Sequence, residues 1–239
     1  MSGHSKWSTI KRKKELTDNK RANIFSKIAK EIAVAVKLGG EDVNSNSRLK
    51  DVITKARKNN MPNDNIKNTI KKAVGNMQNI NYEEITYEGF GPFNTAFIIE
   101  TLTDNKNRTI ADIKHIFTKN CGNIGQTGCT SYLFDHLGNI VIENFNIDID
   151  KLSDEAISNF AEDIIINEDC IEILINITNF SKAKEYFDNT KYNIISEEIE
   201  YRAKSDIDLN EEQKQKLIDF INNLEDNNDI QNIYYNSNI

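Results

Sequence analysis

The chain has 239 residues and a formal net charge of −7, a length that allows one large domain or two to three small ones with apolar cores. Its three cysteines form no C-x-x-C pair, which argues against a disulfide framework or a cysteine zinc site and fits the reducing cytoplasm. The basic start is not followed by the apolar segment of a signal peptide, and no run of about 18 apolar residues occurs, so we expect a cytoplasmic protein without a membrane span.

Charge is distributed unevenly along the chain. Residues 1–80 hold 18 lysines and arginines against 7 acids, a balance of +11, whereas residues 81–239 hold 12 against 30, a balance of −18. The sequence therefore describes a basic head on an acidic body, and a basic head is typical of proteins that bind a polyanion.

The first stretch gathers cations around the single tryptophan, as Gly3-His4-Ser5-Lys6-Trp7 followed by Lys11-Arg12-Lys13-Lys14. An aromatic ring beside mobile cations can stack on a base while the cations hold phosphates. A solvated terminus is the alternative, but an exposed tryptophan there has no core to join. We predict a nucleic-acid-binding arm that consists of Lys6, Trp7, Lys11, Arg12, Lys13, Lys14, Lys20 and Arg21.

Three amphipathic helices are predicted after the arm, over residues 21–38, over residues 46–59, and from a cap at Asn63 or Asp64 to Gly75. Gly39-Gly40 ends the first helix, because glycine readily adopts the left-handed conformation. One apolar stripe per helix predicts a small bundle with basic outer faces. A solvated lysine face is the alternative to a binding surface, for which we predict Lys55, Arg57, Lys58, Lys67, Lys71 and Lys72.

The acidic body alternates strand and helix patterns. Strands are expected at 85–88, 95–102 and Thr130–Phe134, with a helix at 107–120. A second unit follows in the ferredoxin-like order βαββαβ, with strands at 139–143, 163–167, 170–177 and 193–203 and helices at 152–161 and 180–188. A helix at 211–224 and a strand at 230–235 complete the first unit.

We therefore predict an α+β fold, with an N-terminal three-helix domain and two ferredoxin-like α/β domains, the second inserted in the first. The predicted domains are residues 1–79, residues 80–135 together with 207–239, and residues 136–206. The acidic runs around Asp148–Glu155, Glu168–Glu172 and Glu197–Glu200 are expected to be solvated faces.

Catalytic chemistry has little support in the sequence. The three histidines are scattered, so we predict no catalytic residue, no metal site and no cofactor. Gly122-Asn123-Ile124-Gly125 matches the G-x-x-G of KH domains, but a strand follows it, which favours a tight turn. Asp104–Arg108 opens a helix, where it either caps the helix or offers contacts at a cleft through Asn105, Lys106 and Arg108.

Several motifs together resemble the YebC/PmpR family, which includes the mitochondrial translational activator of cytochrome c oxidase. They are Gly3–Trp7 with the basic run, Leu38-Gly39-Gly40, Tyr87-Glu88-Gly89, Leu102-Thr103-Asp104-Asn105 with Asn107-Arg108-Thr109, and the tail Asp229–Tyr234. The resemblance implies three domains around a cleft, and a function as a DNA-binding transcriptional regulator or a ribosome-associated translation factor. Phe93-Asn94, Cys121 and Cys129 depart from the family pattern.

The function predicted from these observations is a non-enzymatic nucleic-acid-binding regulator of gene expression, first as a DNA-binding transcriptional regulatory protein. The alternative is a ribosome-associated translational activator that binds ribosomal RNA through the arm. An enzyme or small-molecule-binding α/β domain with an accessory basic head is a third reading. We expect a monomer.

Overall fold

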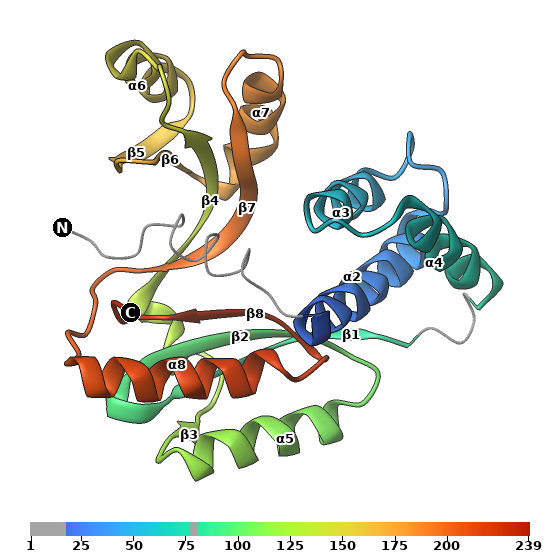
Figure 1. Cartoon of the computed structure of the whole chain (residues 1–239), viewed down its shortest axis with the longest axis vertical. Helices are drawn as coiled ribbons and strands as arrows, with labels where there is room; N and C mark the ends of the chain where they lie inside the picture. Colours follow the sequence, from blue (N-terminus) through green and yellow to red (C-terminus); the bar gives the residue numbers. More distant parts are fainter. Residues whose placement is uncertain (1–17, 77–80) are drawn as a thin grey trace. The chain divides into compact units, whose positions relative to one another are not determined.

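The computed structural model describes residues 18–76 and 81–239, with the side chains of residues 18–20 excepted (Figure 1). The described residues divide into two compact units. One comprises residues 18–129 with 211–233, and the other residues 130–210 with 234–239. The α+β fold class is confirmed by the helices and the two four-stranded sheets. The predicted domain boundaries stay a proposal.

The three helices predicted after the arm are confirmed as α2 (Asp18–Gly39), α3 (Ser47–Lys58) and α4 (Asn63–Gly75). Their apolar stripes meet in one core that includes Ile32, Leu49 and Ile66. The predicted cap of α4 is wrong, because Pro62 occupies the cap position and makes no side-chain cap hydrogen bond. Asp64 lies instead in the first turn, where a carboxylate favours the helix dipole.

The turn between α2 and α3 is organised around the buried side chain of Asn46. Its Nδ2 donates to the carbonyl oxygens of Ala35 at 2.8 Å and Gly40 at 2.7 Å, and its Oδ1 accepts from the Leu49 amide at 3.0 Å. A Cβ on Gly39 would lie 2.7 Å from Asn46, and Gly40 has a φ of +80°. The two glycines therefore end α2 and also make room for the asparagine that fixes the turn.

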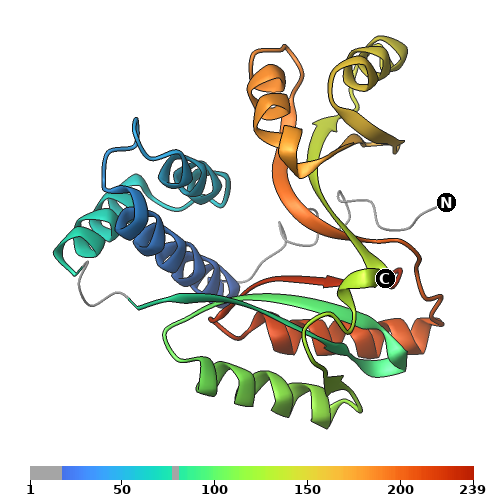
Figure 2. The ribbon, with the colours of Figure 1, turned by 180° about the vertical axis from the view of Figure 1, so that it is seen from behind.

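The first sheet has the order β3-β1-β2-β8. Its strands are β1 (Glu83–Phe90), β2 (Ala96–Thr103), β3 (Asn123–Ile124) and β8 (Ile230–Tyr235). Helices α5 (Lys106–Lys119) and α8 (Glu211–Glu225) cover one face (Figures 1 and 2). Phe97, Phe117 and Phe220 meet there edge to face, with ring centroids 5.0–5.8 Å apart, and join both helices to the sheet.

The second sheet confirms the predicted βαββαβ order. Its elements are β4 (Phe134–Glu143), α6 (Ile149–Asn159), β5 (Ala161–Ile166), β6 (Cys170–Ile175), α7 (Ile177–Asp188) and β7 (Ile194–Ala203). The strands are antiparallel in the order β5-β6-β4-β7. Ile140, Ile173 and Phe187 belong to the core that the two helices form with the sheet.

Two predictions near the glycine-rich loop need correction. Thr130–Phe134 is not a strand: Ser131–Leu133 forms a 3₁₀ turn, in which the Leu133 amide donates to the Thr130 carbonyl at 2.9 Å. The strand begins at Phe134, so the predicted strand at 139–143 is only its second half. Asn123–Ile124 is itself a strand, paired with Gly89 and Phe90, so the strand lies within the G-x-x-G segment.

A substitution at Gly138 tests the packing of α7 against the second sheet. A Cβ at this position would overlap the ring of Phe180 on α7. We expect Gly138→Ala to lower the free energy of unfolding by about 1–3 kcal/mol, because the buried ring must move. Gly75→Ala is the matched control, since no atom lies within 4 Å of its Cβ position. Urea unfolding monitored by circular dichroism compares them, and equal stability of the two variants would contradict the packing argument.

Candidate nucleic-acid interface

Helices α3 and α4 are amphipathic, with apolar residues on the inner face and cations on the outer face. Leu49, Val52, Ile53 and Ala56 of α3 are buried, as are Ile66 and Ala73 of α4. Five exposed cations of these helices form no ion pair with another described residue: Lys50, Arg57, Lys67, Lys71 and Lys72. We call this set the free cation set. Its members keep their full charge for an external anion.

Other cations of the helical segment are used within the fold. Lys55, a predicted contact, places Nζ 2.7 Å from Glu31 Oε1 on α2. Arg48 pairs with Glu84 on β1. Arg21 and Lys58 are exposed. The structure thus separates the predicted basic faces into neutralised and free cations, a distinction that helical spacing does not reveal.

The arm predicted from the sequence falls almost wholly outside the described residues. This applies to Lys6, Trp7, Lys11, Arg12, Lys13 and Lys14. Only the backbone of Lys20 is described, within α2. The contribution of the arm stays a prediction.

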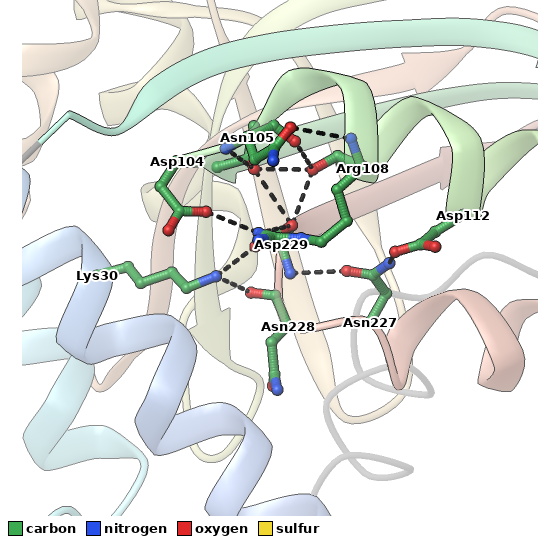
Figure 3. A network of polar contacts seen from close by, with 10 residues as sticks. Lys30, Asp104, Asn105, Arg108, Asp112, Asn227, Asn228 and Asp229 are labelled. Carbon is green, nitrogen blue, oxygen red and sulfur yellow. Dashed lines mark hydrogen bonds and ion pairs between the residues drawn. The ribbon is translucent and has the colours of Figure 1, made fainter.

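The Asp104–Arg108 segment opens α5 and has intramolecular partners (Figure 3). Asn105 caps the helix, with Oδ1 accepting from the Arg108 amide at 3.1 Å. The Arg108 guanidinium donates to Asp104 at 2.7 Å and to Asp229 at 2.8 Å. Lys106 is exposed and makes no ion pair within the described part of the chain. Of the three candidate cleft contacts, Lys106 alone keeps an uncommitted charge, and their role in binding stays a prediction.

Asp229, which sequence reasoning did not single out as a site residue, is the centre of this network and only 4% exposed. Lys30 Nζ lies 2.6 Å from Oδ1, and the Thr109 hydroxyl donates to Oδ2 at 2.8 Å, as Thr103 does at 3.2 Å. Figure 3 shows Lys30 of α2 and Arg108 of α5 converging on Asp229 in the turn before β8. One carboxylate therefore connects three separate segments.

The same network shifts the pKa values of two of its members, Asp229 and Arg108. Burial alone would raise the pKa of Asp229, but hydrogen bonds from Lys30, Arg108 and Thr109 outweigh it and lower the pKa from 3.8 to about 2. Hydrogen bonds to Asp229 and Asp104 raise the pKa of Arg108 further above its ordinary value. Both groups stay charged across the physiological range.

A depression of about 480 Å³ lies at this network. It is lined by Ser26, Lys30, Asp104, Arg108, Asp112, Asn227, Asn228 and Asp229. Its three carboxylates outnumber its two cations, so it offers no net positive charge to a phosphate. This arrangement is suited to joining segments more than to binding an anion.

A second depression, of about 730 Å³, lies beside β1 and α5. Its lining is Ile85, Thr86, Tyr87, Ile110, Lys114, Asn123, Ile124, Gly125, Gln126 and Thr127, in which Lys114 is the single charged side chain. Among residues 18–76 and 81–239, no cluster of three or more His, Cys, Asp or Glu side chains is arranged to hold a metal ion. None of the helices described for this chain has the length and apolarity needed to cross a membrane.

Comparison with known proteins gives matches along nearly the whole chain. The family model for the TACO1/YebC protein N-terminal domain matches residues 5–76, and the model for the TACO1/YebC second and third domain matches residues 82–237. A "probable transcriptional regulatory protein" of Caldicellulosiruptor saccharolyticus is 45% identical over 99% of this chain and 98% of its own. A protein with the same description from Syntrophus aciditrophicus is 45% identical over 100% of this chain and 96% of its own.

A solved structure has the same fold. The crystal structure of a conserved hypothetical protein from Aquifex aeolicus superposes with a TM-score of 0.79 at 36% identity, covering 92% of this chain and 91% of the other.

Asp229→Asn tests the network. A carboxyl whose pKa falls from 3.8 to about 2 on folding contributes roughly 2 kcal/mol to stability above pH 4, and this contribution is lost as the pH falls toward 2. We therefore expect the variant to be less stable by about 2–3 kcal/mol at pH 7, and the difference to shrink between pH 4 and pH 2. Denaturant titrations at several pH values measure it.

Asp112→Asn is the control for that experiment, because Asp112 is an exposed carboxylate at the same depression. A pH-independent difference between Asp229→Asn and the wild type would contradict the assignment of the network to ionised Asp229.

Proposed function

Because the chain belongs to the TACO1/YebC family, we propose that it is a nucleic-acid-binding regulator of gene expression that acts without catalysis. Its binding surface comprises the free cation set of α3 and α4 together with the basic arm. Relatives that share 45% identity carry the description of probable transcriptional regulatory proteins, which supports a regulatory role.

The observation that carries this proposal is the state of the cations on α3 and α4. Lys50, Arg57, Lys67, Lys71 and Lys72 are exposed without an ion-pair partner among the described residues. Lys67 and Lys71 are four residues apart on one helix, where like charges repel by roughly 0.2–0.5 kcal/mol. Folding gains nothing from this arrangement, whereas binding of a phosphate backbone relieves the repulsion and releases counterions.

Duplex DNA is the first candidate partner, in keeping with the description of the relatives. Four of the five free cations are lysines, which provide a point charge and little of the bidentate base recognition that arginine supports. We therefore propose DNA binding of low sequence specificity, dominated by phosphate contacts.

Ribosomal RNA is the second candidate partner. The same predominance of lysine suits recognition of backbone and shape, and the Trp7 ring of the arm could stack on an unpaired base. If ribosomal RNA is the partner, the protein is a ribosome-associated translation factor. The acidic remainder of the chain, with −18 over residues 81–239, disfavours contact with either nucleic acid outside the basic head.

The absence of catalysis is part of the proposal. Neither depression is lined by a histidine or a cysteine. The carboxylates of the first depression are held in ion pairs or hydrogen bonds within the fold. This composition supports a binding protein over a hydrolase or a transferase.

Reversing the charge of two free cations tests the interface. Lys67→Glu/Lys71→Glu keeps a like-charge pair on α4, so the stability of the helix should change little. We expect weaker binding to a random duplex and to a ribosomal RNA fragment, and a slope of log K against log salt that is smaller by about 1.4–1.8, because two phosphate contacts are lost. Fluorescence anisotropy titrations over a range of salt concentrations measure the slope.

Lys182→Glu/Lys191→Glu provides the matched control. Both residues are exposed in the second unit, and the change in net charge is the same. If both double variants reduced the slope equally, net charge would explain the result and the α4 face would not be the interface.

The variant Trp7→Ala distinguishes between the two candidate partners, duplex DNA and ribosomal RNA. If the arm stacks on unpaired bases, the variant should lose ribosome co-sedimentation by more than it loses affinity for random duplex DNA, with a loss of about 1–3 kcal/mol per stacked base. Trp7→Phe keeps a ring and should retain most of the binding. Unchanged ribosome association, or selection of one duplex site by about a thousandfold over random sequence, would favour the transcriptional version.

A further inference from the structure

The first sheet has an edge that is only partly paired. Strand β1 consists of residues Glu83–Phe90, and all of them pair with β2 on one side. On the other side, β3 pairs with Gly89 and Phe90 alone. Within residues 18–76 and 81–239 no further strand lies along that side of β1, so residues 83–88 have no strand neighbour there. We call residues 83–88 of β1 the open edge.

The open edge presents backbone hydrogen-bonding groups to solvent. The Gly125 amide donates to the Glu88 carbonyl at 2.9 Å, so the backbone groups of Glu88 point toward this side. Because the direction of these groups alternates along a strand, the amides and carbonyls of Thr86 and Glu84 point the same way. Both residues are exposed. A row of such groups is a template for one more extended strand.

A turn after β3 prevents the chain from covering the open edge itself. The carboxylate of Glu88, which is 5% exposed, accepts a hydrogen bond from the Gly128 amide at 2.8 Å. Gly128 has a φ of +90°, a backbone conformation that glycine adopts readily. The chain therefore forms a turn beside Glu88 and does not continue along β1 as a strand.

The depression of about 730 Å³ lies along the open edge and has an apolar wall. Phe97 of β2 faces α5 and is paired with Gly89 of β1. Tyr87 and Ile85 precede Gly89 at two-residue steps, so their side chains face α5 as well. Together with Ile110 of α5 they line the depression, and all three are half-buried. A strand added at the open edge would place every second side chain against this wall.

The charge at the depression favours an acidic group in the added strand. Lys114 of α5 is the single charged side chain in the lining. It is exposed and forms no ion pair with another described residue. Lys106, Ile110 and Lys114 follow one another at four-residue steps, so they lie along one stripe of α5. A carboxylate opposite Lys114 would form an ion pair without breaking an existing one.

A second copy of β1 and a nucleic acid both suit the open edge less well. The open edge contains Glu83, Glu84 and Glu88 and no cation, so pairing with itself would bring like charges together across the strands. The same three glutamates, beside the single lysine of the depression, disfavour contact with a phosphate backbone.

We propose that the open edge and the depression form a docking site for an extended peptide segment of another protein, which adds to the sheet beside β1. The segment has apolar side chains at alternate positions, which contact Ile85, Tyr87 and Ile110, and an acidic side chain opposite Lys114. Its backbone bonds to Thr86 and runs antiparallel to β1, as β3 does. This site shares no residue with the free cation set, so docking does not depend on nucleic-acid binding.

Selection from a phage-displayed library of random peptides of about ten residues tests the site on the full-length protein. Thr86→Pro is the comparison, because it removes the outward amide and proline is tolerated on an edge strand. We expect the wild type to enrich peptides with alternating apolar residues and an acid, and Thr86→Pro to bind them about three- to tenfold more weakly. Absence of enrichment, or equal affinity of the two proteins, would overturn the docking.

Lys114→Glu tests the charge at the site without altering the strand. Fluorescence anisotropy with a labelled enriched peptide should show binding that is weaker by about three- to tenfold. Lys182→Glu is the matched control, since it makes the same change at an exposed position of α7, and it should bind as the wild type does. Circular dichroism and the unfolding midpoint establish that each variant is folded. Equal effects of Lys114→Glu and Lys182→Glu would contradict the assignment of the acidic group to Lys114.

Amide hydrogen exchange measured by nuclear magnetic resonance locates the bound peptide. The outward amides of Thr86 and Glu84 should exchange rapidly in the free protein and slowly with the peptide, whereas the Ile85 amide, which points toward β2, should change little. Peptide-induced protection elsewhere, with none at Thr86, would overturn the docking. Protection of Thr86 by a random DNA duplex, or by a higher protein concentration alone, would assign the open edge to nucleic acid or to a second copy instead.

Discussion

The buried carboxylate of Asp229 is the interaction on which the first unit depends. Lys30 reaches it across 199 positions of the sequence, and Arg108 across 121, so the ion pairs connect α2, the start of α5 and the turn before β8. Burial of one charge is costly, and it persists because charged and hydroxyl donors surround both oxygens. Lys27 adds a bond from α2 to the Glu225 carbonyl at 2.7 Å, so the basic helices are attached to the sheet by side chains of α2.

The ion pairs of this attachment neutralise some of the cations of the helical segment. The cations that stay unpaired define the proposed interface. The balance of +11 over residues 1–80 counts Lys30, Lys55 and Arg48, which form ion pairs within the fold. A neutralised cation attracts a polyanion weakly, so the number of lysines overstates the interface. What distinguishes α3 and α4 is that the free cation set lacks such partners among the described residues. The location of free charge, more than the total, supports a binding surface at this position.

The helices and strands that were predicted correctly are those whose burial pattern can be seen within a short stretch of sequence. The apolar stripe over residues 21–38 identified α2, and the βαββαβ alternation identified the second sheet, because burial repeats with the period of each element. Asp229 has no such signal, since its partners lie far away in the chain. The runs Glu168–Glu172 and Glu197–Glu200 were expected to be solvated, and this is wrong for Glu172 and Glu200, which are 1% and 8% exposed. Composition alone does not tell which face of a strand is covered. Thr130–Phe134 looked extended because its residues favour strands, whereas an i→i+3 bond from Leu133 turns the chain first.

The range of electrostatic forces limits how the two charged parts of the chain act on a polyanion. At physiological salt, exposed charges separated by more than about 8 Å are largely screened, so the acidic body cannot repel nucleic acid at long range by net charge alone. The free cation set of α3 and α4 acts at contact distance, where screening is weak. Because its members form no ion pair with another described residue, contact with a phosphate breaks no existing salt bridge. Binding by such a surface depends on the phosphate density of the partner more than on its base sequence.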